Sequence, residues 1–308
     1  MTLNFTIIIP TYNRADILNK TLFSLTQHIK QCKFTCELYI VDNNSTDNTK
    51  DIALAYKECG FVNYLFEERQ GKNFCLNTAI NLAKGKTLIF VDDDIIPQEN
   101  WLENIHQSII NWPDKDVFGG KVTPLFPSKT PAWVREGQFA NFVYAIHSLE
   151  QAEGPYTGNI TPTGPNCWVN KKVFDNGYYY DHNIGPQGKG RVSGSELEFF
   201  TRIAKAGYHP VYVPSAEVLH QIQPFQTTIK YLLKRSYSSG TGFAYIYGFG
   251  DVKRLFNIPR FLYGQVLKFF LLSLVKYITF NPREGFQLLM DMSHRLGCIK
   301  ACKERKDS

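Results

Sequence analysis

Apolar runs and helical patterns alternate along the first 112 residues of the chain. Four short apolar runs bounded by polar or turn-forming residues predict buried strands, at 6–10, 38–41, 62–66 and 87–91. Helical spacing of apolar residues and helix-start signals predict helices after these strands, at 17–29, 48–56, 73–83 and 98–111. This βαβ succession predicts an α/β fold with a mostly parallel sheet and helices on both faces.

From about residue 113 the pattern loosens and then changes in kind. Stretches rich in Pro and Gly at 119–131 and 154–165 are typical of loops that face a ligand. Regular patterns return as a helix and two short strands, at 194–206, 211–214 and 216–220. The sequence therefore predicts one domain over 1–222, in halves of 1–112 and 113–222, and a helical extension over 223–308.

The positive charge of the chain is concentrated in its last third. The net charge is +6, but residues 221–308 carry 14 Lys and Arg against 5 Asp and Glu, and the remainder carries 20 against 23. Such a basic segment suggests an anionic partner, such as a membrane surface or a lipid pyrophosphate, although a charge excess also serves solubility alone. Nucleic acid is not expected as a partner, because the segment has no recognisable nucleic-acid-binding motif.

The most hydrophobic window, Phe261–Phe280, lies inside this basic extension. Its interrupting residues, Gln265, Lys268 and Lys276, fall within an arc of about 80° on a helix. The longest uninterrupted apolar run, Phe269–Val275, is too short to cross a bilayer core of about 30 Å. We therefore expect an amphipathic helix at a membrane surface rather than a transmembrane one, with a core helix as the alternative.

Seven cysteines are scattered along the chain, and no leader-like segment stands at the N-terminus. The pairs Cys32/Cys36 and Cys298/Cys302 are far apart and differ from zinc-ribbon spacing, so we expect reduced thiols rather than a zinc site. The chain runs almost directly into the strand-like residues 5–9, so a secretory signal is not expected. Together these features predict a cytoplasmic protein.

Three consecutive aspartates, Asp92, Asp93 and Asp94, close the most apolar of the predicted strands. In open α/β sheets, ligands bind at the carboxyl ends of the strands. Three like charges at one strand end repel one another, so a divalent cation with an anionic ligand such as a nucleotide diphosphate fits them. A solvated acidic turn is the alternative interpretation.

Four further motifs accompany the aspartates in a fixed order. They are Ile7–Arg14 (IIIPTYNR), Val41–Asp47 (VDNNSTD), Glu68–Lys72 (ERQGK) with Asn77 beyond it, and the downstream pair Gly194–Phe200 (GSELEFF) and Pro214–His220 (PSAEVLH). Each motif alone is a weak signal, but together and in register they resemble a family 2 glycosyltransferase with the GT-A fold. The resemblance covers roughly residues 4–222, and such enzymes often carry helical, membrane-associated tails.

The resemblance assigns nucleotide-binding roles to residues of the first half. Pro10, Thr11, Tyr12 and Asp42 match positions that hold the nucleotide base, where a carboxylate accepts a base N–H and Tyr12 stacks on the ring. Arg69 and Lys72 fall in the segment that approaches the nucleotide, where a positive charge suits a base carbonyl or a phosphate, and Asn77 matches a recurrent amide. The alternatives are a helix-capping or turn role for Asp42, solvated cations and a structural Asn77.

The resemblance also implies a metal site. Asp92 matches the acid that faces the ribose, Asp93 the variable middle position, and Asp94 the metal-binding acid. His220 matches the histidine that completes the metal site in many relatives. Carboxylate, imidazole and phosphate ligands together favour Mn²⁺, with Mg²⁺ as the second choice.

Glu196 is the catalytic base that the resemblance implies. An acid at this helix start takes the proton of the acceptor hydroxyl, which attacks the anomeric carbon with inversion. Ser195 stands where relatives usually have Glu, so Glu198 is the second candidate. Gly164 is expected to let the chain approach the sugar, and Trp168 either stacks on a pyranose or lies in the core.

Two further interpretations concern a loop and the overall activity. The glycine-rich residues 183–191 are expected to close over the donor, with an ordinary exposed loop as the alternative. The expected activity is metal-dependent, inverting transfer from a nucleotide sugar, UDP-linked by preference, to a saccharide or lipid-linked acceptor. This activity would serve cell-envelope or extracellular polysaccharide synthesis at the inner face of the membrane. The rival hypothesis is a degenerate nucleotide- or carbohydrate-binding module. A dinucleotide-binding or nucleotidylyltransferase site is disfavoured, because the first strand lacks the glycine-rich turn.

Overall fold

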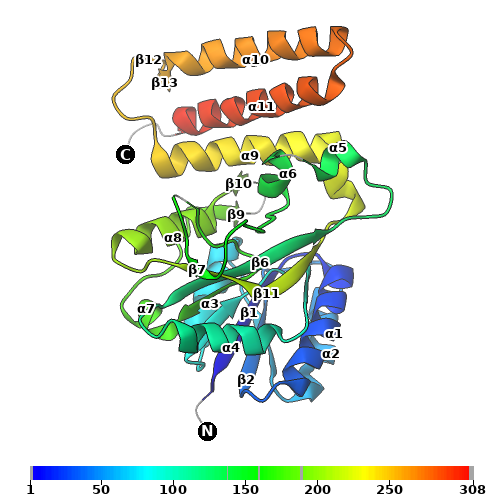
Figure 1. Cartoon of the computed structure of the whole chain (residues 1–308), viewed down its shortest axis with the longest axis vertical. Helices are drawn as coiled ribbons and strands as arrows, with labels where there is room; N and C mark the ends of the chain where they lie inside the picture. The colour runs from blue at the N-terminus through cyan, green and yellow to red at the C-terminus, as the bar shows by residue number, and fades with distance from the viewer. Residues whose placement is uncertain (1–2, 137, 159, 188–189, 305–308) are drawn as a thin grey trace. The chain divides into compact units, whose positions relative to one another are not determined.

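The computed structural model describes residues 3–136, 138–158, 160–187 and 190–304, which divide into two compact units (Figure 1). The first unit contains residues 1–125, 144–182 and 195–222. The second contains residues 126–143, 183–194 and 223–308. The helical extension predicted from residue 223 therefore shares its unit with two segments from the preceding part of the chain.

A nine-stranded sheet, counted over the described residues, forms the centre of the first unit. Its strands run in the order β3-β2-β1-β4-β8-β6-β11-β5, and β7 pairs with β11. The strands are β1 (Phe5–Thr11), β2 (Cys36–Asp42), β3 (Val62–Phe66), β4 (Thr87–Phe90), β5 (Ile95–Pro97), β6 (Val117–Leu125), β7 (Gly154–Pro155), β8 (Cys167–Asn170) and β11 (Val211–Gln221). The first four strands pair in parallel, so their carboxyl ends meet at one edge of the sheet.

Helices cover both faces of this sheet, as the sequence predicts (Figure 1). Side chains alternate along a strand, so Ile7 and Ile9 of β1 join one apolar core and Ile8 joins the other. The first core is shared with α1 (Ala15–Gln31), α2 (Thr49–Ala55) and α4 (Trp101–Asn111). The second is shared with α3 (Lys72–Leu82), α7 (Lys171–Asp175) and α8 (Ser195–Lys205). The short helix η1 (Lys57–Cys59) follows α2.

The second half of the sheet departs from the simple parallel pattern. Strand β8 runs antiparallel between β4 and β6. The two strands predicted at 211–214 and 216–220 are one strand, β11, whose register with β6 shifts between Val213 and Glu217. Trp168 of β8 is fully buried and stacks on Phe118, with the ring centroids 5.7 Å apart. Trp168 is therefore a core residue, and the expectation that it stacks on a sugar is wrong.

Three long helices form most of the second unit: α9 (Ile229–Tyr247), α10 (Arg260–Ile278) and α11 (Pro282–Glu304). Helix α11 lies between α9 and α10 (Figure 1). Gly240 of α9 faces the backbone of His294, and Gly297 of α11 faces the backbone of Tyr237. A Cβ at either glycine would clash with that backbone, so these glycines set the close packing of α9 on α11.

The remaining elements of the second unit are short. They are α5 (Ala132–Arg135), α6 (Gln138–Val143), β9 (Gly185–Gln187), β10 (Gly190–Val192), η2 (Pro224–Thr227), β12 (Arg254–Leu255) and β13 (Ile258–Pro259). Strands β9 and β10 pair antiparallel and overlap the segment 183–191 that the sequence predicts as a loop. Residues 188 and 189 lie outside the described residues.

Helix α10 is apolar and largely exposed within its unit. The helix has 19 residues, and its most apolar window has a mean hydropathy of 1.4. Only 11% of that window is buried. Among the described residues, it is the one helix long and apolar enough to cross a membrane. The sequence-based expectation of a segment too short to span a bilayer rested on the uninterrupted apolar run alone. The whole helix is long enough to span one. Helix α10 is therefore not a core helix of its own unit.

Candidate active site

The three aspartates follow β4 at the edge where the parallel strands end. Strand β1 pairs with β4, so the turn that follows β1 lies beside the aspartates. The acids do not act as one group, because they divide between two cations. Arg14 contacts Asp93 and Asp94, and Lys72 contacts Asp92.

The first cluster joins Arg14, Asp93 and Asp94. Arg14 Nη1 lies 2.8 Å from Asp93 Oδ1, and Arg14 Nη2 lies 2.6 Å from Asp94 Oδ2. The Thr11 hydroxyl donates to Asp93 Oδ2 at 2.7 Å. Both carboxylates are almost fully buried, at 5% and 4% side-chain exposure. A planar guanidinium is the side chain that can bridge two carboxylates in this way.

Burial and charge set the protonation of this cluster. Burial opposes ionisation of Asp94, but His220 and Arg14 outweigh it and hold the pKa of Asp94 well below its usual range. Burial raises the pKa of Asp93, and Arg14 offsets only part of that rise. Burial lowers the pKa of Arg14, but the two aspartates raise it further, so the guanidinium stays charged.

His220 completes this cluster from β11. Its Nε2 lies 3.2 Å from Asp94 Oδ1, and its Nδ1 lies 2.6 Å from the carbonyl oxygen of Tyr144. A carbonyl oxygen only accepts hydrogen bonds, so Nδ1 carries a proton; Nε2 can donate to Asp94 when the ring is protonated and can bind a metal when the ring is neutral. Burial lowers the pKa of His220, but the Asp94 carboxylate outweighs burial and raises it.

These residues fit a divalent metal only as part of a ligand shell. Asp94 Oδ1 is buried, accepts no hydrogen bond among the described residues, and faces His220 Nε2. Within the described ranges, no three His, Cys, Asp or Glu side chains gather closely enough to hold a metal by themselves. Carboxylate and imidazole are suitable ligands for Mn²⁺ or Mg²⁺. The chain therefore offers Asp94 and His220, and the remaining ligands would have to come from another molecule.

The second cluster joins Lys72, Asp92 and Glu196. Lys72 Nζ lies 2.7 Å from Asp92 Oδ1 and 2.7 Å from Glu196 Oε1. Lys72 begins α3 and Glu196 lies in the first turn of α8, so two helix starts converge on the aspartates. Burial lowers the pKa of Lys72, but Asp92 and Glu196 outweigh it and raise the pKa. Lys72 therefore remains an ammonium group between two carboxylates.

Gly164 lies against this second cluster. A Cβ at Gly164 would clash with Glu196 Oε1 and would lie 2.9 Å from Glu196 Cδ and 3.0 Å from Lys72 Nζ. The absence of a side chain at Gly164 therefore makes room for the pair of Lys72 and Glu196. Glu198, the second candidate base, accepts hydrogen bonds from Arg202 at 2.6 and 3.1 Å instead.

The predicted base-binding residues line the ends of β1 and β2. Pro10 is buried in β1, and Tyr12 just beyond it is 43% exposed, so its ring is accessible. Asp42 is buried and accepts hydrogen bonds from the Ser45 backbone N–H and the Tyr64 hydroxyl, each at 2.9 Å. Asp42 thus organises the turn after β2, which is the turn role given as its alternative.

Arg69 and Asn77 do not join the two clusters. The Arg69 guanidinium donates to both carboxylate oxygens of Glu67 at 2.8 Å and lies over the ring of Phe74. The Asn77 amide donates to the Tyr180 carbonyl at 2.8 Å and accepts from the Tyr180 N–H at 3.1 Å. Asn77 is buried and holds this backbone segment, so its structural alternative describes its contacts better than a nucleotide contact does.

Among the predicted residues, the structure brings together Thr11, Lys72, Asp92, Asp93, Asp94, Gly164, Glu196 and His220. Arg14 is the contacting residue that the sequence analysis did not select. It lies inside the motif IIIPTYNR, three residues after Thr11, so its position at a strand end was the available signal. Which acids it contacts depends on the parallel pairing of β1 with β4.

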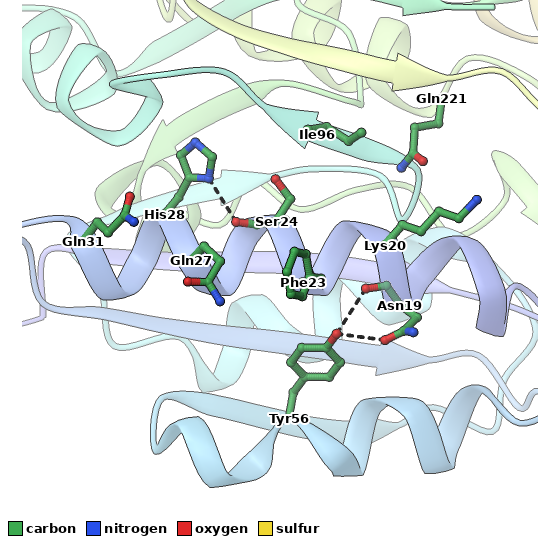
Figure 2. A pocket seen from close by; sticks show the side chains of 10 residues that line it. All are labelled: Asn19, Lys20, Phe23, Ser24, Gln27, His28, Gln31, Tyr56, Ile96 and Gln221. Atoms are coloured by element: carbon green, nitrogen blue, oxygen red, sulfur yellow. Dashed lines mark hydrogen bonds between the residues drawn. The ribbon is translucent and has the colours of Figure 1, made fainter. Parts of the chain in front are cut away.

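A separate groove of about 560 Å³ lies on the outer surface of α1 (Figure 2). Amide and aromatic side chains dominate its lining: Asn19, Lys20, Phe23, Ser24, Gln27, His28, Gln31, Tyr56, Ile96 and Gln221. The Tyr56 hydroxyl donates to the Asn19 side chain at 2.8 Å, and His28 bonds the Ser24 carbonyl (Figure 2). The residues of the two ionic clusters do not line this groove.

Comparison with known proteins identifies the class to which this chain and its fold belong. Residues 6–177 match the sequence profile of glycosyl transferase family 2. The chain is 30% identical over 241 residues to glycosyltransferase AglE of Haloferax volcanii, covering 77% of this chain and 71% of that protein. It is 26% identical over 176 residues to a glucosyl-dolichyl phosphate glucuronosyltransferase of the same organism, covering 56% of this chain and 55% of that one.

A solved structure gives the same result for the fold. The mannosyltransferase PcManGT from Pyrobaculum calidifontis, in complex with GDP-Man and Mn²⁺, aligns with a TM-score of 0.64 at 17% identity. The alignment covers 99% of this chain and 89% of that one. The chain belongs to glycosyl transferase family 2. It is a glycosyltransferase with the GT-A fold, as the sequence motifs predict, and an enzyme rather than a binding module.

Proposed function

We propose that the chain transfers a sugar from a nucleotide diphosphate donor to a hydroxyl of a saccharide or lipid-linked acceptor, with inversion at the anomeric carbon. The contact of Lys72 with both Asp92 and Glu196, each at 2.7 Å, carries this proposal. It joins a carboxylate able to act as a base to the aspartates at the strand end. One lysine thus connects the donor side of the site with the acceptor side.

Glu196 acts as the base in this proposal. Its carboxylate takes the proton of the acceptor hydroxyl while that oxygen forms a bond to the anomeric carbon. The bond from the anomeric carbon to the diphosphate oxygen breaks, and the nucleotide diphosphate leaves with the electron pair. Lys72 and Gly164 orient Glu196, the first by its hydrogen bond and the second by leaving room.

The donor side of the site is assigned from the first cluster and the turns beside it. Asp94 and His220 would hold Mn²⁺ or Mg²⁺, and the metal would supply positive charge to the diphosphate leaving group. The complex of PcManGT with GDP-Man and Mn²⁺ supports a divalent metal in this proposal. Tyr12 and Asp42 would meet the base, and a uridine nucleotide remains the expected donor.

The acceptor side of the proposal extends to a membrane. One relative is named as a glucosyl-dolichyl phosphate glucuronosyltransferase, which supports a lipid-linked acceptor here. Helix α10 exposes large apolar residues such as Leu267, Leu271 and Val275, and it carries Lys268 and Lys276. Such a helix suits an anionic membrane surface. We place the enzyme at the cytoplasmic face of the cell membrane, in cell-envelope or extracellular polysaccharide synthesis.

The test of the activity uses UDP- and GDP-linked sugars with and without Mn²⁺. Transfer or slow donor hydrolysis is measured for the wild type, Glu196→Gln and the matched control Glu198→Gln. We expect Glu196→Gln to lose at least about 100-fold in rate while it still binds nucleotide, because it cannot accept the proton. Glu198→Gln should keep most of the activity, because Glu198 pairs with Arg202. Full activity of Glu196→Gln would reject the assignment.

The test of membrane association uses cosedimentation with vesicles. Binding to anionic vesicles should exceed binding to neutral ones and should weaken as salt rises, because Lys and Arg charges drive it. The double variant Lys268→Glu and Lys276→Glu should bind anionic vesicles more weakly. Equal binding of the variant and the wild type would exclude α10 as the basic membrane surface.

A further inference from the structure

The carboxylate oxygens of Asp93 and Asp94 are unequally available to a metal. The Arg14 guanidinium pairs with Asp93 Oδ1 and Asp94 Oδ2, and the Thr11 hydroxyl donates a hydrogen bond to Asp93 Oδ2. Asp94 Oδ1 remains; it is buried, accepts no hydrogen bond among the described residues, and faces Nε2 of His220, the second proposed metal ligand, at 3.2 Å. Two acids next to each other would ordinarily offer four oxygens to a cation, but here a single oxygen stays available.

Arg14 already supplies the positive charge that these acids need. Its guanidinium cannot be deprotonated in a protein, so it is a permanent cation beside Asp93 and Asp94. Its backbone carbonyl accepts the first helical hydrogen bond of α1, from the N–H of Leu18 at 3.0 Å. The start of α1 therefore fixes the backbone that carries this cation, while 31% of the Arg14 side chain remains exposed.

We infer that Arg14 is an internal counter-cation that makes metal binding at Asp94 depend on the nucleotide diphosphate. This inference rests on the proposed function, since it concerns the same metal site. A free divalent cation would meet one carboxylate oxygen, one imidazole and the repulsion of the guanidinium. The two phosphates of the nucleotide add oxygen ligands and negative charge, and so overcome that repulsion. Metal and nucleotide therefore bind together, and the aspartates alone retain little metal.

A merely structural role of Arg14 gives the opposite expectation. If Arg14 only held Asp94 in the orientation that a metal requires, removing the guanidinium would weaken metal binding under every condition. If Arg14 is the counter-cation, removing it exposes Asp94 Oδ2 and Asp93 Oδ1 and removes the repulsion. Free metal would then bind more tightly. The sign of the change in affinity for metal alone distinguishes the two roles.

The experiment measures Mn²⁺ binding to the full chain, without sugar donor, from the loss of the free Mn²⁺ paramagnetic resonance signal. Titrations use wild type, Arg14→Gln and Arg14→Lys, each with no nucleotide, with UDP and with GDP. We expect nucleotide to tighten Mn²⁺ binding to wild type by about tenfold or more. Arg14→Gln should bind Mn²⁺ alone about tenfold more tightly than wild type. Arg14→Lys keeps the charge and should stay within about threefold of wild type.

Several outcomes overturn the inference. Arg14→Gln binding Mn²⁺ alone as weakly as wild type, or more weakly, would show that Arg14 only positions Asp94. An equal gain in Arg14→Lys would show that the fork geometry matters and the charge does not. Tight binding of Mn²⁺ alone to the wild type would overturn the inference without any variant, which keeps it testable if Arg14→Gln does not fold. Adding Asp94→Asn to Arg14→Gln should abolish the gain.

Failure of the proposed function gives a different result. In that case neither nucleotide would strengthen Mn²⁺ binding in any variant. Failure of this inference alone would leave the nucleotide effect in the wild type intact while Arg14→Gln gained nothing. Circular dichroism and thermal unfolding of each variant establish that a change in Mn²⁺ binding is measured on folded protein.

Discussion

The two ionic clusters of the site share one arrangement of charges and differ in their surroundings. Each places one cation between two carboxylates, Arg14 between Asp93 and Asp94, and Lys72 between Asp92 and Glu196. The carboxylates of the first are 5% and 4% exposed, whereas those of the second are 26% and 22% exposed. Solvent and substrates therefore reach the second cluster more readily than the first.

The difference in burial has physical consequences. A buried carboxylate that loses its partner is left uncompensated, so the contacts of the first cluster are held by the fold. In the more exposed cluster, water or a substrate hydroxyl can replace a contact at lower cost. We interpret the Arg14 cluster as a fixed framework and the Lys72 cluster as the part that exchanges contacts during the reaction. Variants in the two clusters should separate loss of activity from loss of stability.

Replacing Lys72 should have the largest effect on activity. Lys72→Met keeps an unbranched side chain but removes the hydrogen bonds to Asp92 and Glu196, so the two carboxylates repel each other and Glu196 loses its orientation. We expect the turnover rate for transfer to fall by at least about 100-fold. Saturating-substrate kinetics measure the rate, and urea unfolding measures the stability.

The control for Lys72 is Lys20→Met, an exposed lysine of α1 outside both clusters. It should leave turnover close to the wild-type value. A Lys72→Met protein that kept wild-type turnover with only a higher KM would contradict the comparison. It would show that Lys72 binds substrate without orienting Glu196.

Gly164→Ala tests the cluster of Lys72, Asp92 and Glu196 by adding a methyl group beside it, without removing any charged or polar group. The added methyl group would displace the ends of Glu196 and Lys72, which are flexible, rather than backbone. We expect transfer to fall by about 10- to 100-fold, because a misplacement of about 1 Å at a catalytic group has this scale of effect. The unfolding midpoint should change little.

Gly154→Ala is the matched control for Gly164→Ala, because nothing lies within 4 Å of a Cβ at Gly154. It should leave both transfer and stability near wild type. Loss of stability in Gly164→Ala without loss of rate would assign this glycine to the fold rather than to the site.

The sequence was sufficient to predict the first half of the fold. The run at 87–91 coincides closely with β4, a fully buried strand that is apolar on both faces. The run at 62–66 coincides with β3, which lies at the end of the sheet and is only partly buried. The prediction that the aspartates lie at a ligand-facing edge follows from strand polarity alone. Their contacts with Thr11, Lys72 and His220, and the contact of Lys72 with Glu196, are consistent with motifs in register, although the roles of these residues stay predictions.

The sequence was insufficient wherever a contact depends on which strands pair or on the direction in which a side chain points. Arg14 bridges two acids about 80 residues away, because β1 lies beside β4. Whether Trp168 faces the core depends on the alternation along β8, and whether Asn77 faces Tyr180 depends on how α3 packs. Composition likewise could not show which side of α10 is covered by α11.

His147 gives a pH-dependent contrast with His220 within the first unit. His220 faces Asp94, whereas His147 is buried beside the Tyr156 hydroxyl at 2.6 Å, and burial lowers its pKa to about 4. Between the ordinary value of 6.5 and about 4, the unfolded state binds the extra proton. This contribution to stability is therefore complete above pH 6.5 and is lost as the pH falls to 4.

The loss should reach about 3 kcal/mol at pH 4, measured as the free energy of unfolding in urea at several pH values. His147→Gln keeps a polar partner for Tyr156 but does not titrate, so its stability should fall less between pH 6.5 and 4.5. Parallel pH profiles for variant and wild type would show that His147 has an ordinary pKa.

Thr11→Val probes the buried framework with the smallest change. It removes the hydroxyl that donates to Asp93 Oδ2 and leaves a nearly equal volume. A buried carboxylate that loses a donor should cost about 2 kcal/mol in the free energy of unfolding. The matched control is Thr26→Val in α1, a buried residue whose hydroxyl donates to the neutral carbonyl of Phe23 at 3.2 Å in a partly buried hydrogen bond.

Thr26→Val should cost about 1 kcal/mol, because a hydrogen bond to a neutral acceptor contributes less than one to a charged acceptor. Urea unfolding at one pH above 7 compares the two variants while their surroundings keep the same charge. A cost for Thr11→Val no larger than that for Thr26→Val would mean that Asp93 is neutral in the folded protein. Arg14 would then balance Asp94 alone, and the two clusters would differ in charge as well as in burial.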